Sequence, residues 1–276
     1  MKRYTRYKNE YVVSYADYGD KSGFPILVNH GLIASITDCH LFDQAVERGA
    51  RLISIARPGY GESAPYRVRD IAEWADIASV VIDELGLARV DVLGMSSGAP
   101  YSYAIGHKFR DRVRKIYIFS GIPALFDQEV LSSWPFDVDK NADLAALQTL
   151  AHELFFANLS EEDFQRNDIK DSMMHHCFGI AQDFKLRCLD WGFRLSEVKP
   201  YVHMRHSRQD TAVPFAMALR TSKLLPNCFL EISENGEHFS KEALDDFIHS
   251  MITAYNKDVD QKIDPPIFPN HYMKES

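Results

Sequence analysis

The stretch Val90-Asp-Val-Leu-Gly-Met-Ser-Ser-Gly98, followed by Ala99-Pro-Tyr-Ser-Tyr-Ala-Ile-Gly106, decides the predicted fold. Residues 90–93 are typical of a short buried strand, and the second stretch is compatible with a helix. Gly94 and Gly98 flank Ser96 on either side and predict a tight turn there. A strand, a turn and a helix in this order indicate a βαβ unit. Taken alone, the turn also fits a plain connection in which a serine caps the helix.

Short runs rich in β-branched residues occur on both sides of this stretch, separated by segments of helix length. They lie at residues 25–29, 51–56, 113–119, 201–206 and 228–232. Together with residues 90–93 they predict a parallel sheet. Apolar residues at intervals of three and four predict a helix over 69–85, ending at Gly86. Further helices are predicted from about Pro214 and over 241–255.

The two ends of the chain depart from this rhythm. The alternating residues 11–16 and the turn-like residues 18–24 predict a hairpin at the start of the sheet. Residues 257–276 contain Asp264-Pro-Pro and Phe268-Pro-Asn and predict a C-terminal tail.

After Gly121 the alternation of strands and helices stops. Residues 122–199 contain helical patterns, such as 142–159, and no convincing strand. The sequence therefore predicts an α/β core formed by residues 1–121 and 200–256, interrupted by a helical insertion at 122–199.

Composition narrows the class of protein. With 276 residues, 46% hydrophobic and 25% charged, the chain resembles average globular proteins, which excludes collagen-like and wholly disordered chains. The 31 Lys and Arg against 39 Asp and Glu give a net charge of −8, so no nucleic-acid partner is expected. No apolar stretch suits a membrane span or an export signal, and the four cysteines are scattered. A cytoplasmic location is therefore expected.

Two further residues at predicted strand ends bear on chemistry. Asp210 follows the strand predicted at 201–206, and His238 follows the strand predicted at 228–232. Because parallel strands end at the same sheet edge, both residues are expected near Ser96. Asp210 alone also fits the cap of the next helix, and His238 alone fits a solvated loop. Three such residue types in this order at three strand ends favour a joint chemical role.

These motifs resemble those of the α/β-hydrolase superfamily over roughly residues 10–255. The motifs that carry the resemblance are His30-Gly31, Arg57-Pro-Gly-Tyr-Gly-Glu-Ser63, Gly94-Met-Ser-Ser-Gly98, Asp210-Thr-Ala-Val-Pro214 and Gly236-Glu-His238. The resemblance implies a mostly parallel α/β-hydrolase sheet flanked by helices, with residues 122–199 as an inserted helical cap, or lid.

The resemblance also implies a role for each site residue. Ser96 is expected as the nucleophile, His238 as the general base, and Asp210 as the acid that orients His238. The backbone amides of Leu32 and Ser97 are expected to form the oxyanion hole. Because the chain has one His-Gly pair and no His-Gly-Gly-Gly run, Ile33 is the alternative to Leu32.

A substrate pocket is expected above Ser96, lined by His30, Gly31 and aromatic residues of the insertion. These aromatic residues are Trp134, Phe136, Phe155, Phe156, Phe178 and Trp191, although packing of a cap on its core explains most such residues.

No cofactor and no metal ion are expected. Gly59-Tyr-Gly61 lacks the third glycine of a dinucleotide-binding loop. His175-His176-Cys177 has the wrong spacing for ligands on one helix face.

The predicted activity is that of a carboxylesterase-type serine hydrolase acting on a small, largely apolar ester or related acyl compound through an acyl-Ser96 intermediate. Alternatives on the same three residues are an aminopeptidase resembling proline iminopeptidases, a carbon–carbon hydrolase, an acyltransferase, and a receptor-like member with slow turnover. His30-Gly-Leu-Ile departs from the His-Gly-Gly-Pro of the iminopeptidases, which disfavours that alternative. The expected partner is a small acyl substrate, and a homodimer is an open alternative to a monomer.

Overall fold

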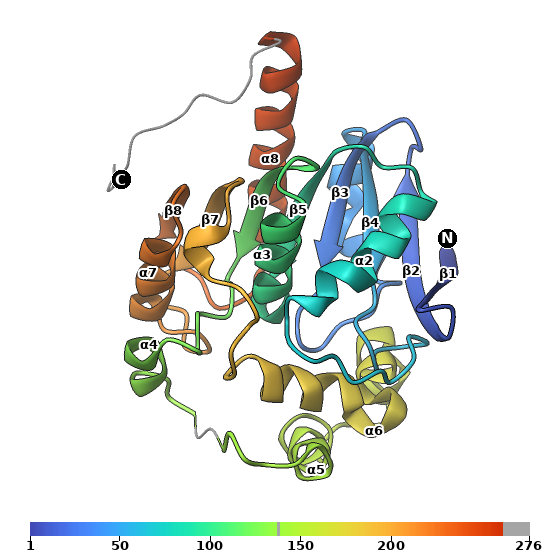
Figure 1. The fold of residues 1–276 in the computed structure, drawn as a ribbon, viewed down its shortest axis with the longest axis vertical. Coiled ribbons are helices and arrows are strands. Elements are labelled where there is room, and N and C mark those ends of the chain that lie inside the picture. The colour runs from blue at the N-terminus through green and yellow to red at the C-terminus, as the bar shows by residue number, and fades with distance from the viewer. Residues whose placement is uncertain (137–138, 262–276) are drawn as a thin grey trace.

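An eight-stranded sheet forms the centre of the molecule, which is a computed structural model that describes residues 1–136 and 139–261 (Figure 1). The strand order is β1-β2-β4-β3-β5-β6-β7-β8. The strands are β1 (Lys2–Tyr7), β2 (Tyr11–Gly19), β3 (Phe24–Asn29), β4 (Ala50–Ile55), β5 (Val90–Met95), β6 (Val113–Phe119), β7 (Tyr201–Ser207) and β8 (Cys228–Ser233). β3 to β8 are parallel to one another, whereas β2 is antiparallel to both β1 and β4. The predicted α/β class with a mostly parallel sheet is therefore confirmed.

The N-terminal hairpin differs from the prediction. It joins β1 to β2 through Lys8 and Asn9, whose φ angles of 51° and 58° are typical of a tight hairpin turn. The predicted turn at residues 18–24 instead connects β2 to β3, and β4 lies between these two strands. β1 was not predicted because it is an edge strand with mainly exposed and polar residues, which leave no alternating apolar pattern.

Eight α-helices are found in the described residues. They are α1 (Asp43–Glu47), α2 (Glu73–Glu84), α3 (Ala99–Lys108), α4 (Gln128–Ser132), α5 (Leu144–Phe155), α6 (Asn167–Leu186), α7 (Phe215–Leu224) and α8 (Lys241–Gln261). Figure 1 shows α2 and α3 in front of the sheet, with α8 behind it. Apolar residues of α2 and α3 pack on one face, and those of α1 and α8 pack on the other. Each sheet face is thus covered, which explains the continuous apolar runs of the parallel strands.

Two helix boundaries differ from the predicted ones. α2 begins at Glu73 and not at residue 69, because Asp70 Oδ1 accepts the amide of Glu73 at 3.0 Å and residues 69–72 form the preceding turn. Its end is as predicted, with Gly86 in a left-handed conformation at φ 62° just beyond the helix. α8 extends to Gln261, so the first residues of the predicted tail are helical, and residues 262–276 lie outside the described residues.

The segment 122–199 contains α4, α5 and α6 and, in its described part, no strand. These helices lie beyond the edge at which the parallel strands end (Figure 1). α5 begins where Asp143 Oδ1 accepts the amide of Ala146 at 2.8 Å. The carboxyl ends of the strands therefore face a helical layer.

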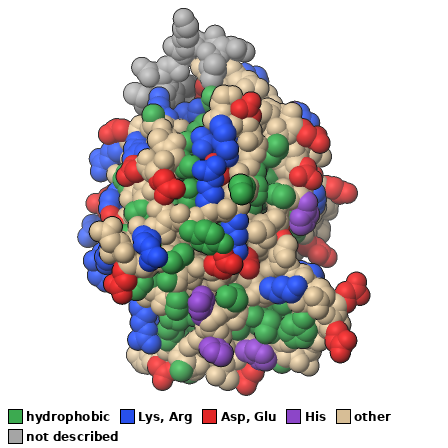
Figure 2. Space-filling view, turned by 90° about the vertical axis from the view of Figure 1, so that its right-hand side faces the viewer, with side chains coloured by type: hydrophobic (Ala, Val, Ile, Leu, Met, Phe, Trp, Pro, Cys, Tyr) green, Lys and Arg blue, Asp and Glu red, His purple; other side chains and the backbone are tan. Residues whose placement is uncertain are grey.

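The surface carries charges of both signs. On the face shown in Figure 2, basic side chains lie close to acidic ones. Within residues 1–136 and 139–261, none of the helices combines the length and the apolar character that crossing a bilayer requires.

Candidate active site

The turn after β5 forces Ser96 into an unusual backbone conformation. Ser96 has a φ of 48°, which places it in the left-handed region that side chains other than glycine rarely adopt. The two flanking glycines lie in close contact with other elements. A β-carbon on Gly98 would lie 2.1 Å from the carbonyl oxygen of Asn29 at the end of β3, and one on Gly94 would lie 2.4 Å from Ser102 Oγ in α3. Glycine at both positions therefore lets β3, β5 and α3 approach closely around Ser96.

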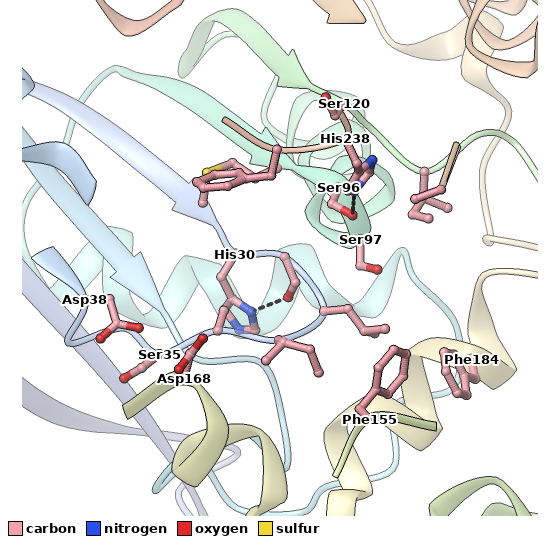
Figure 3. A pocket seen from close by; sticks show the side chains of 18 of the residues that line it. His30, Ser35, Asp38, Ser96, Ser97, Ser120, Phe155, Asp168, Phe184 and His238 are labelled. Carbon is pink, nitrogen blue, oxygen red and sulfur yellow. Dashed lines mark hydrogen bonds between the residues drawn. The ribbon is translucent and has the colours of Figure 1, made fainter. Parts of the chain in front are cut away.

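The structure brings Ser96, His238 and Asp210 together. His238 Nε2 lies 2.8 Å from Ser96 Oγ, and His238 Nδ1 lies 2.8 Å from Asp210 Oδ2. Figure 3 shows the contact between the serine and the histidine. Because a carboxylate only accepts hydrogen bonds, Nδ1 donates to Asp210 and Nε2 is left to accept the serine hydroxyl. This arrangement can remove a proton from Ser96.

Asp210 is held by four groups. Its Oδ1 accepts the amides of Ala212 and Val213 at 2.9 and 2.8 Å, and its Oδ2 lies 2.8 Å from His238 and 3.3 Å from His206 Nε2. Burial alone would raise the pKa of Asp210, but the hydrogen bonds from His238 and from the amide of Val213 hold that pKa below its usual range. Asp210 is therefore ionised near neutral pH and favours the required orientation of the imidazole.

The loop that carries His238 is attached to the end of β7. Ser207 Oγ donates to the carbonyl oxygen of Gly236 at 2.6 Å, and Gly236 adopts a φ of 120°. The sequence also missed His206, which is fully buried beside Asp210 and donates through Nε2 to the carbonyl oxygen of Val213 at 2.8 Å. Burial lowers the pKa of His206, which keeps the ring neutral. The signal for His206 in the sequence was only its position at a strand end.

The loop after β3 lies beside Ser96. A β-carbon on Gly31 would lie 3.9 Å from Ser96 Cβ, and Leu32, Ile33 and Ser97 line the same cavity as Ser96. Asn29 anchors this loop, since it accepts Trp74 Nε1 at 2.8 Å and donates to Ser102 Oγ at 2.9 Å. Leu32 and Ser97, the two residues predicted to supply oxyanion-hole amides, thus line the same cavity as Ser96.

His30 is buried and neutral. Burial lowers the pKa of His30 well below its usual range, and the nearby Arg57 acts in the same direction. Its Nε2 accepts the amide of Arg57 at 3.2 Å, and its Nδ1 donates to the carbonyl oxygen of Gly31 at 2.8 Å. Although His30 lines the cavity, both ring nitrogens are used within the protein. Its hydrogen bonds hold the loop after β3 against the loop after β4.

Arg57 and Asp183 form a buried ion pair that sequence analysis missed. Arg57 donates to the carbonyl oxygens of His30 and Gly31 at 2.6 and 2.9 Å. It also donates to Asp183 Oδ2 in α6 at 2.6 Å. Arg57 thus connects the loop beside Ser96 to helix α6. Asp183 lies 126 residues away in the sequence, so no local signal could have indicated the pair.

A cavity of about 1150 Å³ opens beside Ser96 and His238. Its lining includes His30, Gly31, Trp134, Phe136 and Phe155. In the view of Figure 3, Phe155 and Phe184 lie on one side of Ser96, whereas Ser35, Asp38 and Asp168 lie on the other. The lining therefore has an aromatic end and a polar end.

Three of the aromatic residues predicted to line the pocket do not belong to its lining. They are Phe156, Phe178 and Trp191. Trp191 is 1% exposed and packs on Tyr103 and Phe126, and Phe178 packs against Gly59. Trp191 and Phe156 belong to clusters of buried apolar residues, so these side chains pack segment 122–199 on the rest of the molecule and do not line the cavity.

His175, His176 and Cys177 do not share one helix face. They form a left-handed turn inside α6, with φ angles of 53°, 57° and 60°. In the described part of the chain, no three metal-binding side chains are grouped so that they could hold an ion.

Comparison with known proteins places these features in context. A family model described as alpha/beta hydrolase fold matches residues 25–243. The chain is 26% identical over 100 residues to the uncharacterized hydrolase YcgS of Bacillus subtilis, and this match covers 36% of this chain and about a third (35%) of that protein. It is 24% identical over 237 residues to the 2-hydroxy-6-oxononadienedioate/2-hydroxy-6-oxononatrienedioate hydrolase of Escherichia coli (strain K12), covering 77% of this chain and 78% of that protein. A solved esterase from Exiguobacterium antarcticum is similar with a TM-score of 0.71 and 22% identity, covering 93% of this chain and 100% of that chain.

Proposed function

The chain belongs to the α/β-hydrolase fold family, and from this premise we propose that it is a serine hydrolase. The proposed reaction is cleavage of an ester or related acyl compound through an intermediate in which the acyl group is bound to Ser96. The observation that carries the proposal is the continuous hydrogen-bonded chain from Ser96 Oγ through His238 to Asp210 beside a large cavity. A serine hydroxyl has too high a pKa to ionise near neutral pH, so it needs such a base.

In the first half of the reaction, His238 Nε2 takes the hydroxyl proton while Ser96 Oγ attacks the substrate carbonyl carbon. Asp210 stabilises the imidazolium that forms, and its own hydrogen bonds keep it ionised. The carbonyl oxygen becomes an oxyanion, which the amides of Leu32 and Ser97 bind. Loss of one such donor typically lowers the rate about 10²- to 10³-fold.

In the second half, the tetrahedral intermediate expels the alcohol, which takes the proton from His238. A water molecule then gives a proton to His238 and attacks the acyl carbon. Breakdown of the second tetrahedral intermediate releases a carboxylic acid and returns the proton to Ser96. Every bond that forms or breaks is accounted for by the ester, water and these two side chains.

We further propose that residues 122–199 act as a cap over the reacting carbonyl. The support is that the lining contributed by this segment includes the apolar side chains of Trp134, Leu147, Phe155 and Phe184. Such a lining favours a largely apolar acyl group. Trp134 and Phe136 are proposed substrate contacts on the same ground.

Labelling with a fluorophosphonate probe tests the activated serine. We expect a phosphonyl adduct on Ser96, identified by peptide mapping, and its loss in His238→Ala. His249→Ala removes an exposed histidine of α8 and serves as the matched control, which should label as the wild type does. Folded protein whose Ser96 does not react would overturn the proposal.

Turnover is measured separately with short and long p-nitrophenyl esters. Many turnovers per protein molecule support the hydrolase. A single equivalent of p-nitrophenol without further release would instead indicate a ligand-binding member of the fold that is acylated once.

Hydrolysis of a carbon–carbon bond next to a ketone is the second candidate. It is favoured by the similarity to the Escherichia coli 2-hydroxy-6-oxononadienedioate/2-hydroxy-6-oxononatrienedioate hydrolase, whose named substrate contains a ketone and no ester bond. Comparing kcat/KM for p-nitrophenyl butyrate and for a 2-hydroxy-6-ketodienoate separates the two. A preference of tenfold or more for the ketodienoate would select this candidate, and a preference for the ester would reject it.

A further inference from the structure

Asp183 lies in the last turn of α6, and Arg187 directly follows the helix, four residues further along the chain. Asp183 is 4% exposed, and both of its oxygens are fully engaged. Its Oδ1 accepts Tyr101 and Arg57 Nε at 2.5 and 3.3 Å, and its Oδ2 accepts Arg57 Nη2 and Tyr60 at 2.6 and 2.8 Å. The negative charge of Asp183 is thereby matched by Arg57.

Arg187 lines the cavity and has no carboxylate partner. Its Nε is buried and makes no hydrogen bond, and within residues 1–136 and 139–261 it forms no ion pair. The guanidinium carbon lies 4.5 Å from the ring centre of Phe184 and 5.6 Å from that of Trp134. The two rings therefore hold the guanidinium in place without neutralising its charge.

Two cations, the buried Arg57 and the partly buried Arg187, lie near the single carboxylate of Asp183. Asp183 already forms an ion pair with Arg57, so it does not neutralise the charge of Arg187. Burial lowers the pKa of Arg187, although its neighbour Cys188 and Asp183 act in the opposite direction. A partly buried positive charge without a carboxylate partner favours the binding of an anion.

Arg166 provides the contrast within the same cavity. It also lines the cavity, but its guanidinium donates to Asp168 at 2.6 Å and lies 3.6 Å from Asp163. The polar end of the cavity therefore has matched or negative charges, with Asp38 and Asp168 in its lining. Asp139 also lines the cavity, and within residues 1–136 and 139–261 none of these three carboxylates forms an ion pair with Arg187, so its guanidinium is free to attract an anionic ligand.

We propose that Arg187 binds a carboxylate group of the substrate, so that the protein prefers acyl compounds that carry a free carboxylate in addition to the bond that is cleaved. The planar guanidinium offers parallel N–H groups that match a carboxylate. This inference rests on the proposed function only in taking the cavity as the substrate site. The carboxylate lies against α6 beside Phe184 and Trp134, and the apolar part of the substrate lies between it and Ser96.

A binding experiment tests the anchor without any chemical step. In Ser96→Ala protein, titration calorimetry measures the Kd of octanoate and of its neutral counterpart octanamide. We expect octanoate to bind more tightly, and Ser96→Ala/Arg187→Met to weaken octanoate about 10- to 100-fold, the usual effect of losing a hydrogen bond to a charged group. The same substitution should change octanamide binding less than threefold.

Two matched variants sharpen this experiment. Arg166→Met in the Ser96→Ala protein removes a cavity-lining charge that already has partners, and it should leave octanoate binding within about twofold. Arg187→Lys keeps the charge but not the planar fork, so an intermediate Kd is expected, and it replaces Arg187→Met if that variant does not fold. Equal weakening of acid and amide, no effect of either Arg187 variant, or no octanoate binding at all would overturn the proposal.

Kinetics then identify the side of the substrate that carries the carboxylate. One pair of esters is p-nitrophenyl hydrogen adipate and its methyl ester, and the other is 4-(butyryloxy)benzoate and its methyl ester. Arg187→Met should abolish a preference for the acid in one of the pairs, and acid and methyl ester cleaved equally by the wild type in both pairs would overturn the proposal. Absence of cleavage of all four esters would contradict the hydrolase instead, while octanoate binding still decides the role of Arg187.

Discussion

The backbone of Ser96 is strained, and close contacts around its turn hold it in this conformation. Its left-handed backbone is less favourable than an ordinary conformation by about 1–2 kcal/mol, and the surrounding contacts must compensate for that strain. The contacts are those around Gly94 and Gly98, where any side chain would collide with α3 or β3. The glycines therefore fix the direction of the Ser96 hydroxyl rather than simply allowing a turn.

The role of Asp210 can be tested at this scale with Asp210→Asn. An asparagine oxygen can still accept the amides of Ala212 and Val213, so the fold should be retained. The missing negative charge no longer favours the tautomer of His238 that accepts the serine proton. We expect kcat for p-nitrophenyl butyrate to fall about 10³- to 10⁴-fold, measured by steady-state kinetics near neutral pH.

The control for this variant is its thermal unfolding midpoint, which should stay close to that of the wild type. A kcat that falls less than tenfold in a folded Asp210→Asn protein would contradict the assigned role.

At the scale of elements, the Arg57 and Asp183 pair joins the loop after β4 to helix α6 and to the loop after β3. Both side chains are at most 5% exposed. Breaking a buried ion pair by removing one partner leaves an unmatched charge, which typically destabilises a protein by about 3–5 kcal/mol. The pair is therefore a structural link between the inserted helices and the loop beside Ser96.

We expect Asp183→Asn to lower the free energy of unfolding by about 3–5 kcal/mol, measured by urea denaturation. kcat should fall as well, because Arg57 also holds the carbonyl oxygens of His30 and Gly31. Tyr60→Phe removes one hydrogen bond to the same carboxylate and serves as the control, with an expected loss of about 1 kcal/mol. A loss in Asp183→Asn no larger than that in Tyr60→Phe would refute the link.

At the scale of the whole molecule, two glutamates far from Ser96 make stability depend on pH. Burial alone would raise their pKa values, but in Glu231 the hydrogen bonds from His203 and Arg205 lower the pKa to about 2. In Glu73 the amide of Arg69 and the side chains of Tyr66 and Lys8 lower the pKa to about 2. A carboxyl group with a lowered pKa binds fewer protons in the folded state than in the unfolded state, so it stabilises the fold at higher pH.

The stabilisation from Glu231 is therefore complete above its ordinary pKa of 4.5 and is lost as the pH falls towards about 2. Asp91 acts in the opposite sense between about pH 6 and 4, since burial raises its pKa to about 6. Comparison with Glu231→Gln isolates Glu231. We expect this variant to be less stable than the wild type at pH 7, and the difference in unfolding free energy to shrink between pH 4.5 and 2.

Urea denaturation followed by circular dichroism at each pH provides the measurement. A difference between wild type and Glu231→Gln that stays constant from pH 7 to pH 2 would show that Glu231 does not have a lowered pKa in the folded protein.

Much of this architecture was predictable from local patterns. The parallel strands, the end of α2 at Gly86, the helices between β6 and β7, and the positions of Ser96, Asp210 and His238 at strand ends follow from the period of apolar residues and from turn-forming residues. These signals act over a few residues, and the rule that parallel strands end at one edge extends them to the whole sheet.

Tertiary structure alone decided the rest. The presence of the polar edge strand β1 and the pairing of β2 with β4 depend on which surfaces meet. The division of the aromatic residues between core and cavity depends on the same contacts. The pairing of Arg57 with Asp183, and the absence of any such partner for Arg187, likewise result from contacts between segments far apart in the sequence. The physical reason is that burial and charge neutralisation are properties of the assembled interior, whereas periodicity and backbone preference belong to each short segment of the chain.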